Sequence, residues 1–302
     1  MNKRYVQKSK EEKKEELAKI MSDLEAGIRK VYESGDYLRY LQTFSKFHHY
    51  SLSNTILILL QCPEATHVAS FVDWKKKFTR VVKRDEKGLK ILVPTPKKVV
   101  KEQEITNPDG TTSTQLISQE YLHFKIGHVY DISQTVGDPL PTIVKPLTYN
   151  SDSLHSLIEK LISSCEVPIN YDDSLGENSA NGYYRVDTQQ IFLKPSLADL
   201  HKLKTIIHEF SHYEQETKYQ KTVKDFERDT KEVVAESTAF CVLEMLNNEF
   251  NTDTLSSDDY SFGYLASWSS GKDVKELKSS IELISKISES AFNWIAPLFE
   301  VK

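Results

Sequence analysis

The chain has 302 residues, a formal net charge of -5, and 39% hydrophobic and 27% charged residues. This composition excludes a largely disordered chain, and the length allows two ordinary domains. The three cysteines are scattered without CxxC spacing, which excludes a thiolate metal cluster and favours buried thiols. The first residues, MNKRYVQKSKEEKK, lack the apolar stretch of a signal peptide, and no apolar run could cross a bilayer. We therefore expect a cytoplasmic protein with no membrane partner.

The first part of the chain predicts helices followed by strands. Apolar spacing indicates helices at 9–33, 36–48 and 52–61 and extended segments at 89–93 and 121–130. Ser70 and Asp73 form a capping-box-like start for a short helix that contains Trp74. A turn is expected at 107–110, between two polar strand candidates. We therefore predict an α+β fold for this half.

A Pro-rich stretch over 138–146 predicts a linker, because proline stiffens the chain and removes backbone hydrogen bonds. This gives two predicted domains, 1–146 and 147–302. The second is expected to contain a hairpin at 183–186 and 190–193, and a helix that begins at Pro195. Other helices are expected at 151–164, 228–248 and 274–299.

Charge is divided unevenly between these two halves. Residues 1–146 carry a net charge of +6, whereas residues 147–302 carry a net charge of -11. A basic surface can bind a polyanion and an acidic surface repels one. Any role in nucleic-acid binding is therefore expected in the N-terminal half.

His208, Glu209 and His212 form an HExxH motif within one predicted helix. Residues four apart on a helix lie one turn apart on the same face, so both imidazoles can bind one ion. The motif predicts one zinc ion per chain, although manganese, cobalt or nickel would accept the same ligand types. The alternative is a histidine pair without a metal, in the core or on the surface.

A catalytic zinc needs a third protein ligand, and we predict Glu232 on the following long helix. Glu232 and Glu236 fall on an otherwise apolar stripe of this helix, and buried carboxylates require partners. Both charges are satisfied if Glu232 binds the metal and Glu236 accepts the outer N–H of a ligating histidine. If the helix phase differs by one residue, both glutamates are instead solvated.

Glu209 is predicted to be the general base of a peptidase. It lies about 100° round the helix from His208, which directs it at the water and not at the ion. Zinc lowers the pKa of bound water, and Glu209 would take the proton and pass it to the leaving amine. The candidates for stabilising the oxyanion, among which the sequence does not choose, are Tyr184, His201, Tyr213 and Tyr219.

The segment 71–101 carries a net charge of +8 and contains interleaved aromatic residues. Basic side chains bind phosphates, and exposed aromatic rings stack on unpaired bases, which favours single-stranded DNA. The alternative is a solvated charge run over a helix whose aromatic residues face the core. The predicted DNA-binding patch consists of Trp74, Lys76, Lys77, Arg80, Lys83, Arg84, Lys87 and Lys90.

Several segments together give a family resemblance. In the C-terminal half these are GYYRVDTQQIFLKP, IIHEFSHYEQE and KEVVAESTAF, and in the N-terminal half SNTILILL, FVDWKKKF, EKGLKILVP and VYDISQTVGDPLP. The chain resembles the ArdC family of antirestriction proteins, in a Gram-positive mobile-element branch. The resemblance implies an N-terminal single-stranded-DNA-binding domain joined to a C-terminal zincin-like metallopeptidase domain. Glu232 lies 24 residues after His208, which is similar to thermolysin-like gluzincins and supports it as third ligand.

Two functions remain open from the sequence. The first is a zinc metallopeptidase that is delivered to single-stranded DNA and hydrolyses a DNA-associated protein, such as a restriction or DNA-repair factor. The second is a non-catalytic protein that coats transferred single-stranded DNA during conjugation, with a structural zinc. The Glu209→Gln variant separates them, because only the first function depends on that carboxylate.

Overall fold

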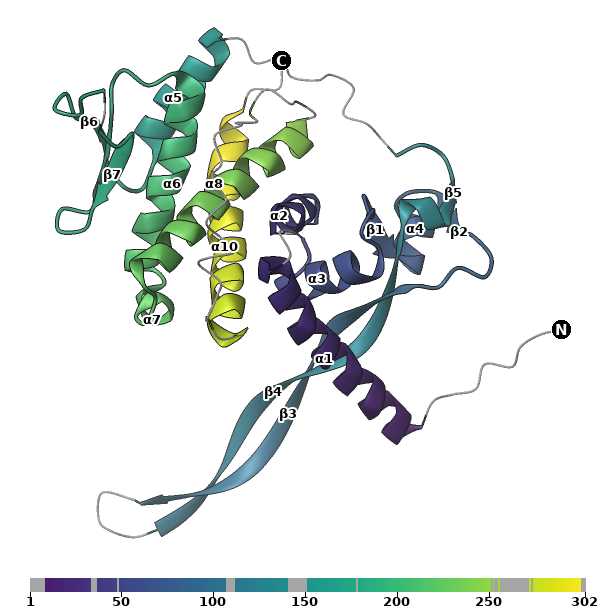
Figure 1. The fold of residues 1–302 in the computed structure, drawn as a ribbon. Coiled ribbons are helices and arrows are strands. Elements are labelled where there is room, and N and C mark those ends of the chain that lie inside the picture. Colours follow the sequence, from purple (N-terminus) through teal and green to yellow (C-terminus); the bar gives the residue numbers. More distant parts are fainter. Residues whose placement is uncertain are drawn as a thin grey trace.

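The structure is a computed structural model, and it describes residues 9–33, 37–47, 49–106, 112–140, 151–177, 179–250, 252, 255, 272 and 274–299. The ribbon in Figure 1 shows a helical body from which one long hairpin extends. The fold is a mixed α+β fold, as the sequence predicts. Among the described helices, none is both long enough and apolar enough to cross a membrane.

The chain begins with helices that the sequence predicts well. They are α1 (Lys10–Glu33), α2 (Tyr37–Lys46), α3 (Leu52–Gln61) and α4 (Phe71–Lys76). On α1, Ile20, Leu24 and Ile28 are buried at four-residue steps, so one stripe of this otherwise charged helix faces the core. Ser70 caps α4, because its hydroxyl oxygen accepts a hydrogen bond from the Asp73 N–H at 3.0 Å.

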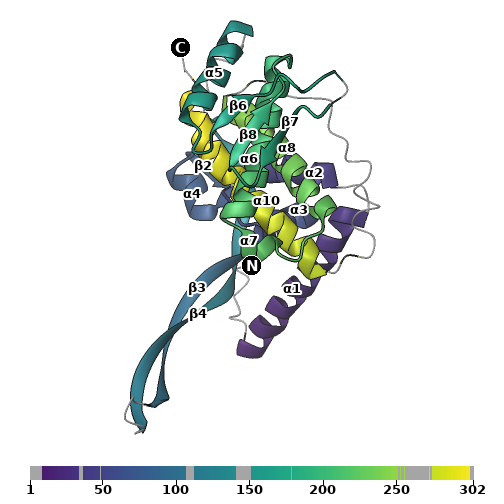
Figure 2. The same cartoon turned by 90° about the vertical axis from the view of Figure 1, so that its left-hand side faces the viewer.

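A long two-stranded hairpin dominates the shape of the N-terminal half (Figures 1 and 2). Its strands β3 (Leu89–Thr106) and β4 (Thr112–Asp131) pair antiparallel along their whole length, and β1 (Val68–Ser70) pairs with the end of β4. A separate small sheet joins β2 (Arg80–Val82) to β5 (Thr135–Gly137), after the 3-10 turn η1 (Ile132–Gln134). The turn predicted at 107–110 lies outside the described residues and stays a prediction.

The C-terminal half places a three-stranded sheet against helices. The sheet has the order β6-β8-β7, from strands β6 (Ile169–Tyr171), β7 (Gly182–Arg185) and β8 (Gln190–Leu193), so β7 is an edge strand. The helices are α5 (Ser151–Ser164), α6 (Asp199–Thr217), α7 (Gln220–Val223), α8 (Arg228–Phe250) and α10 (Val274–Ile295), with the 3-10 turn η3 (Ala296–Leu298).

Two details of the C-terminal half differ from the prediction. The helix that carries the HExxH motif begins at Asp199 and not at Pro195, because Lys194 accepts a hydrogen bond from the Leu197 N–H in a turn after β8. Strand β6 is not predicted, because its three residues are too few to give a period. The predicted domain boundary at 146 lies in 141–150, outside the described residues, and stays a prediction.

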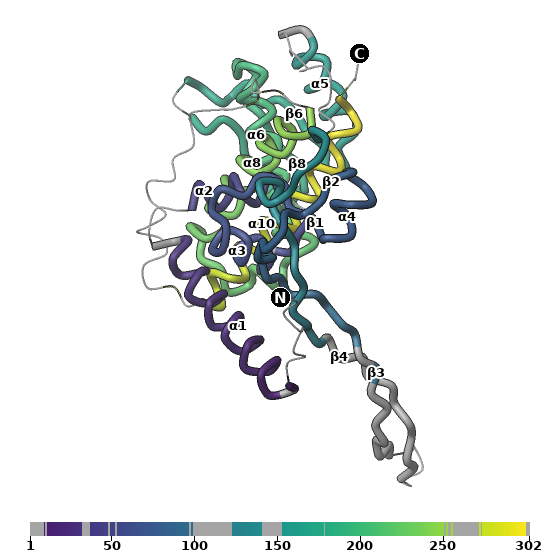
Figure 3. The backbone as a smooth tube through the Cα atoms, turned by 90° about the vertical axis from the view of Figure 1, so that its right-hand side faces the viewer, coloured from purple at the N-terminus to yellow at the C-terminus, as the bar shows by residue number. Residues whose placement is uncertain are grey.

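The two halves of the chain share a hydrophobic core. One buried cluster contains residues of α1, α2 and α3 together with residues of α8 and α10. Figure 3 shows α2 and α3 lying beside α8 and α10, as the contacts between α2 and α8 also indicate. The Tyr37 hydroxyl of α2 lies 2.7 Å from the Ser237 hydroxyl of α8 in this core. A second cluster joins α5, α6, α8 and the sheet of the C-terminal half.

Candidate metal centre

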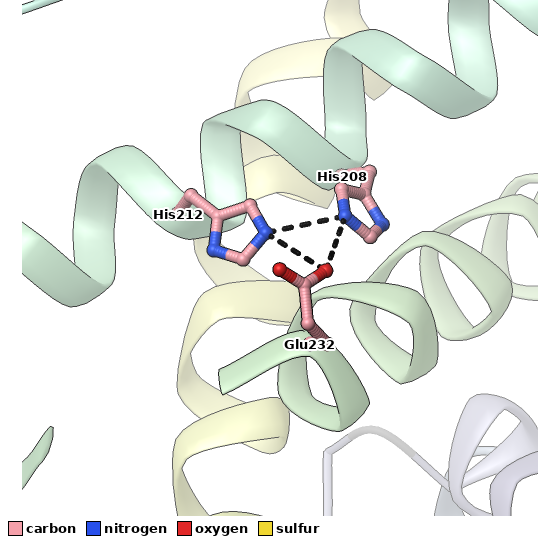
Figure 4. A group of neighbouring side chains, drawn as sticks. All are labelled: His208, His212 and Glu232. Atoms are coloured by element: carbon pink, nitrogen blue, oxygen red, sulfur yellow. Dashed lines mark hydrogen bonds and ion pairs between the residues drawn. The ribbon is translucent and has the colours of Figure 1, made fainter. Parts of the chain in front are cut away.

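Two crossing helices bring three metal-ligand side chains together. Helix α6 presents His208 and His212 one turn apart, and α8 presents Glu232 opposite them (Figure 4). The Nε2 atoms of the two histidines are 3.2 Å apart. Glu232 Oε2 lies 3.4 Å from His208 Nε2 and 3.5 Å from His212 Nε2. A tetrahedral ion with bonds of about 2.0–2.1 Å keeps its ligand atoms about 3.3 Å apart. These three groups therefore fit a single metal ion.

The orientation of His208 is fixed by a second carboxylate. The Nδ1 of His208 lies 3.3 Å from Glu236 Oε2, and Lys204 Nζ lies 2.9 Å from Glu236 Oε1. A proton on Nδ1 leaves the Nε2 lone pair directed at the metal position. The structure thus places Glu236 beside the histidine, where the sequence predicts it, and adds Lys204 as the partner of that carboxylate.

The charges of these groups are strongly coupled. Burial of the His208 ring lowers its pKa, but hydrogen bonds to Glu232 and Glu236 outweigh burial and raise this pKa to about 9. Hydrogen bonds from His208 and His212 lower the pKa of Glu232 far below its usual range. A metal ion would take the place of the proton on His208, because ligating imidazoles must be neutral at the bound nitrogen.

Glu209 lies beside the metal position without belonging to the ligand group. Its side chain is buried, with only 7% of the residue exposed, and burial raises the pKa of its carboxyl group. The two ligand histidines act in the opposite direction on this pKa, and so does a hydrogen bond from the Tyr184 backbone N–H. A buried carboxyl group with a raised pKa suits a general base that must later release its proton.

A cavity of about 800 Å³ opens over these groups and contains the ligands, Glu209 and Glu236 in its wall. Edge strand β7 forms another part of the wall, through Gly182, Tyr183 and Tyr184. A Cβ atom at Gly182 would lie 2.7 Å from the Phe192 carbonyl oxygen, so a larger residue would displace β7 from β8. The metal position therefore faces a cavity bordered by the edge of β7 that pairs with no other described strand.

The four residues predicted as candidates for stabilising the oxyanion differ in whether they line this cavity. Tyr184 and His201 line the cavity, whereas Tyr213 and Tyr219 are not among the described residues of its wall. The Tyr213 ring packs edge-on against Tyr184 at 5.8 Å, and Tyr219 packs against the core around α1 and α10. The Tyr184 hydroxyl is itself buried, so the geometry narrows the prediction to His201.

Side-chain contacts between α6 and α8 hold in place the helical turn of α8 that carries Glu232, and the sequence alone does not reveal them. Gln215 is fully buried on α6, and its amide donates a hydrogen bond to the Lys231 carbonyl oxygen at 3.2 Å. The Lys231 ammonium in turn contacts Glu216 on α6 at 2.6 Å. Lys231 immediately precedes Glu232, so the ligand's turn is attached to α6 by side chains on both helices.

The predicted DNA-binding patch requires one correction. Trp74 is only 1% exposed. Its indole N–H donates a hydrogen bond to the Tyr130 carbonyl oxygen at 2.8 Å, and its ring packs on the Phe78 ring. It cannot stack on a base. Phe71, in the same short helix, is 53% exposed and is the aromatic residue available there. The sequence did not select Phe71 over Trp74, since a six-residue helix is too short to show a buried stripe.

The basic residues of the patch differ in exposure. Arg80 and Lys90 are partly buried: Arg80 donates to the Thr135 hydroxyl at 2.8 Å, and Lys90 pairs with Glu16 at 2.6 Å. Lys83 donates to the Ser133 carbonyl oxygen at 2.7 Å. The exposed members are Lys76, Lys77, Lys83, Arg84 and Lys87.

Comparisons with known proteins agree with the predicted resemblance. Residues 10–130 match the family model of the N-terminal domain of anti-restriction factor ArdC. The uncharacterized protein pXO2-81 of Bacillus anthracis is 27% identical over 97% of this chain, and the chain spans about half of that protein's length (53%).

Two solved structures of the antirestriction protein ArdC from plasmid R388 are also similar. The metal-free structure has a TM-score of 0.48 and 18% identity, and the match covers 83% of this chain and 87% of that chain. The Mn(II)-bound structure has a TM-score of 0.43 and 19% identity, with 82% and 83% covered. The family match thus covers residues 10–130, which are similar to the N-terminal domain of the anti-restriction factor ArdC.

Proposed function

We propose that this chain is an antirestriction-type protein of a mobile element that binds single-stranded DNA and hydrolyses a DNA-associated protein at a zinc site. The observation that supports it most is the group of three ligand atoms at tetrahedral spacing beside the buried carboxylate of Glu209. A structural zinc site needs four protein ligands and no acid or base beside it. Three ligands with an adjacent buried base are typical of a hydrolytic site.

In this proposal the metal is held by His208, His212 and Glu232. When bound, zinc supplies a Lewis acid and lowers the pKa of a water molecule at the open position. Glu209 accepts the proton of that water and later donates it to the amine that leaves. His201, which lines the cavity, donates a hydrogen bond to the developing oxyanion.

The substrate in this proposal is a polypeptide in extended conformation. Among the described strands, β7 pairs with β8 alone, and its other edge borders the cavity. The Tyr184 backbone N–H reaches Glu209, so this free edge runs past the general base. A peptide that adds to such an edge gains main-chain hydrogen bonds and is aligned with the metal position.

The proposed DNA-binding surface is the exposed basic part of the patch together with Phe71. Lysine and arginine bind phosphates of any sequence, and one exposed aromatic ring gives a stacking platform for an unpaired base. The ArdC N-terminal domain over residues 10–130 includes this whole surface.

Metal content and the Glu209→Gln variant test the proposal. We expect one zinc per wild-type chain by plasma mass spectrometry, and its loss or sharp weakening in His212→Ala and in Glu232→Ala. The Glu209→Gln variant should keep the metal and lose cleavage of proteins added together with single-stranded DNA. A folded wild-type protein without stoichiometric metal would contradict the enzyme.

A non-catalytic role is the second candidate, because the proposed ligands also connect α6 to α8, a helix that contributes residues to both hydrophobic cores. A metal there would brace the fold even without catalysis. This candidate predicts that Glu209→Gln protects transferred DNA as well as wild type, whereas His212→Ala melts at a lower temperature and protects poorly.

A further inference from the structure

Arg228 is a cation of the metal cavity that contacts no acidic group among the residues that the structure describes. It is the first residue of α8 and precedes Glu232 by four residues, so the two side chains lie one turn apart on the same face. Both residues line the cavity, and Arg228 is exposed there. Its guanidinium group is charged at any physiological pH.

The other described charges of the cavity already have a role or a partner. Lys204 pairs with Glu236 at 2.9 Å, and Glu216 contacts the Lys231 ammonium at 2.6 Å. In the proposed function Glu232 binds the metal, and Glu209 accepts and donates the proton. With the metal bound, Arg228 is therefore left without a counter-charge among the described residues that line the cavity.

A peptide that covers the cavity would take the Arg228 guanidinium out of water. An unpaired charge is costly to desolvate, whereas a carboxylate can accept two parallel hydrogen bonds from a guanidinium group. Helix α8 begins at Arg228, so the positive end of its dipole also favours an anion here. Side chains one helical turn apart are about 5–6 Å from each other, which corresponds to one or two residues of an extended peptide.

We propose that Arg228 makes the cavity selective for polypeptides with an aspartate or glutamate within two residues of the bond held at the metal. The proposal rests on the peptidase function proposed above, because it specifies the substrate class of that site. Arg228 recognises the substrate in this scheme and takes no part in proton transfer.

The test is a digest of a synthetic peptide mixture, randomised over six positions, by the zinc-loaded full-length protein. Cleaved bonds are identified by mass spectrometry. We expect aspartate and glutamate to be enriched about tenfold within two residues of the cleaved bonds, as one charge-assisted hydrogen-bond pair allows. The enrichment should disappear in Arg228→Gln and change to lysine and arginine in Arg228→Glu.

Two controls keep the result specific. Lys221→Gln removes an exposed positive charge on α7, which does not line the described cavity, and should preserve the acidic preference. The zinc content and melting temperature of each variant establish that the site is intact. Equal enrichment in wild type and Arg228→Gln, or no acidic enrichment in wild type, would overturn the proposal.

A binding measurement separates this proposal from the proposed function itself. Zinc-loaded Glu209→Gln protein is immobilised, the same peptide mixture is passed over it, and the retained peptides are sequenced. Acidic peptides should be retained, and Glu209→Gln combined with Arg228→Gln should lose this preference. If wild type cleaves no peptide but acidic peptides are retained through Arg228, the peptidase function fails and the selectivity stands. If retention shows no acidic preference, the selectivity fails.

Discussion

Replacing Gln215 by methionine should weaken metal binding without weakening the fold. Methionine has a similar volume and keeps the buried packing of this site, but it removes the hydrogen bond from the amide to the Lys231 carbonyl oxygen, 3.2 Å long. Such a bond contributes about 1 kcal/mol net, which corresponds to about a fivefold change in an equilibrium constant. We expect the dissociation constant for zinc to rise about five- to tenfold, because the turn that carries Glu232 loses its attachment to α6.

Stability should respond differently from metal affinity in this variant. The other amide atom, the Gln215 oxygen, is buried and has no hydrogen-bond partner among the described residues, so its removal offsets part of the lost bond. We therefore expect the free energy of unfolding of the metal-free protein to change by less than about 1 kcal/mol.

The assay is competition for zinc against a chromophoric chelator, together with thermal unfolding of the metal-free protein. Ser211→Ala is the matched control, since the Ser211 hydroxyl accepts a long hydrogen bond from the Gln215 amide, at 3.4 Å, and is not bonded to α8 among the described residues, so zinc affinity should stay unchanged. Lys231→Met removes the partly exposed ion pair with Glu216 but keeps the carbonyl group, so its effect should be smaller than that of Gln215→Met. Zinc affinity of Gln215→Met within twofold of wild type would refute the reasoning.

Three further predictions concern DNA binding, protons and the division of the chain. Phe71→Ala should weaken the binding of a fluorescent oligo(dT), measured by anisotropy titration, by roughly 1–3 kcal/mol with little change in stability. Trp74→Ala should instead lower the free energy of unfolding, measured in denaturant, by about 3–5 kcal/mol. Because the pKa of His208 is raised to about 9, zinc binding at pH 7.5 should release about one proton from His208, in addition to the proton that zinc-bound water loses. The His208 contribution should be lost as the pH rises through that pKa, because the imidazole is then already neutral. Calorimetry in buffers of different ionisation enthalpy measures the release, and a total release below one proton at pH 7.5 would contradict the raised pKa. A fragment of residues 1–146 should unfold without cooperativity, because it lacks the α8 and α10 surfaces of the shared core, and a cooperative thermal transition would show that this core is dispensable.

The ligand group was predictable because it depends on spacing within single helices. His208 and His212 are brought together by helical geometry alone, and Glu232 and Glu236 mark the face of the next helix in the same way. Lys204, Gln215 and Arg228 were not identified from the sequence, because their roles depend on where α6 crosses α8. A crossing point is set by the packing of both helices, and neither helix encodes it in its own periodicity.

The exposure of aromatic residues in the basic segment was not predictable for a related reason. Trp74 is buried by its hydrogen bond to the Tyr130 carbonyl, at the end of β4, 56 residues later in the chain. Charge density around an aromatic residue indicates where a polyanion could bind, but burial is decided by such distant contacts. In the proposed DNA-binding surface the exposed lysines therefore remain, and Phe71 replaces Trp74 as the proposed stacking residue.

The relation between the halves depends on packing that charge and proline content do not report. Helix α8 has buried apolar residues on all sides, which indicates a helix enclosed by others, but the sequence does not say which ones. Part of the enclosure comes from α2, whose Tyr37 hydroxyl contacts Ser237, the residue after Glu236. The helix that carries Glu232, the proposed third metal ligand, is thus packed against the half that contains the match to the ArdC N-terminal domain. Any movement of α2 on binding DNA would have to be accommodated at the turn of α8 that adjoins the metal site, because a close-packed core transmits displacement and does not absorb it.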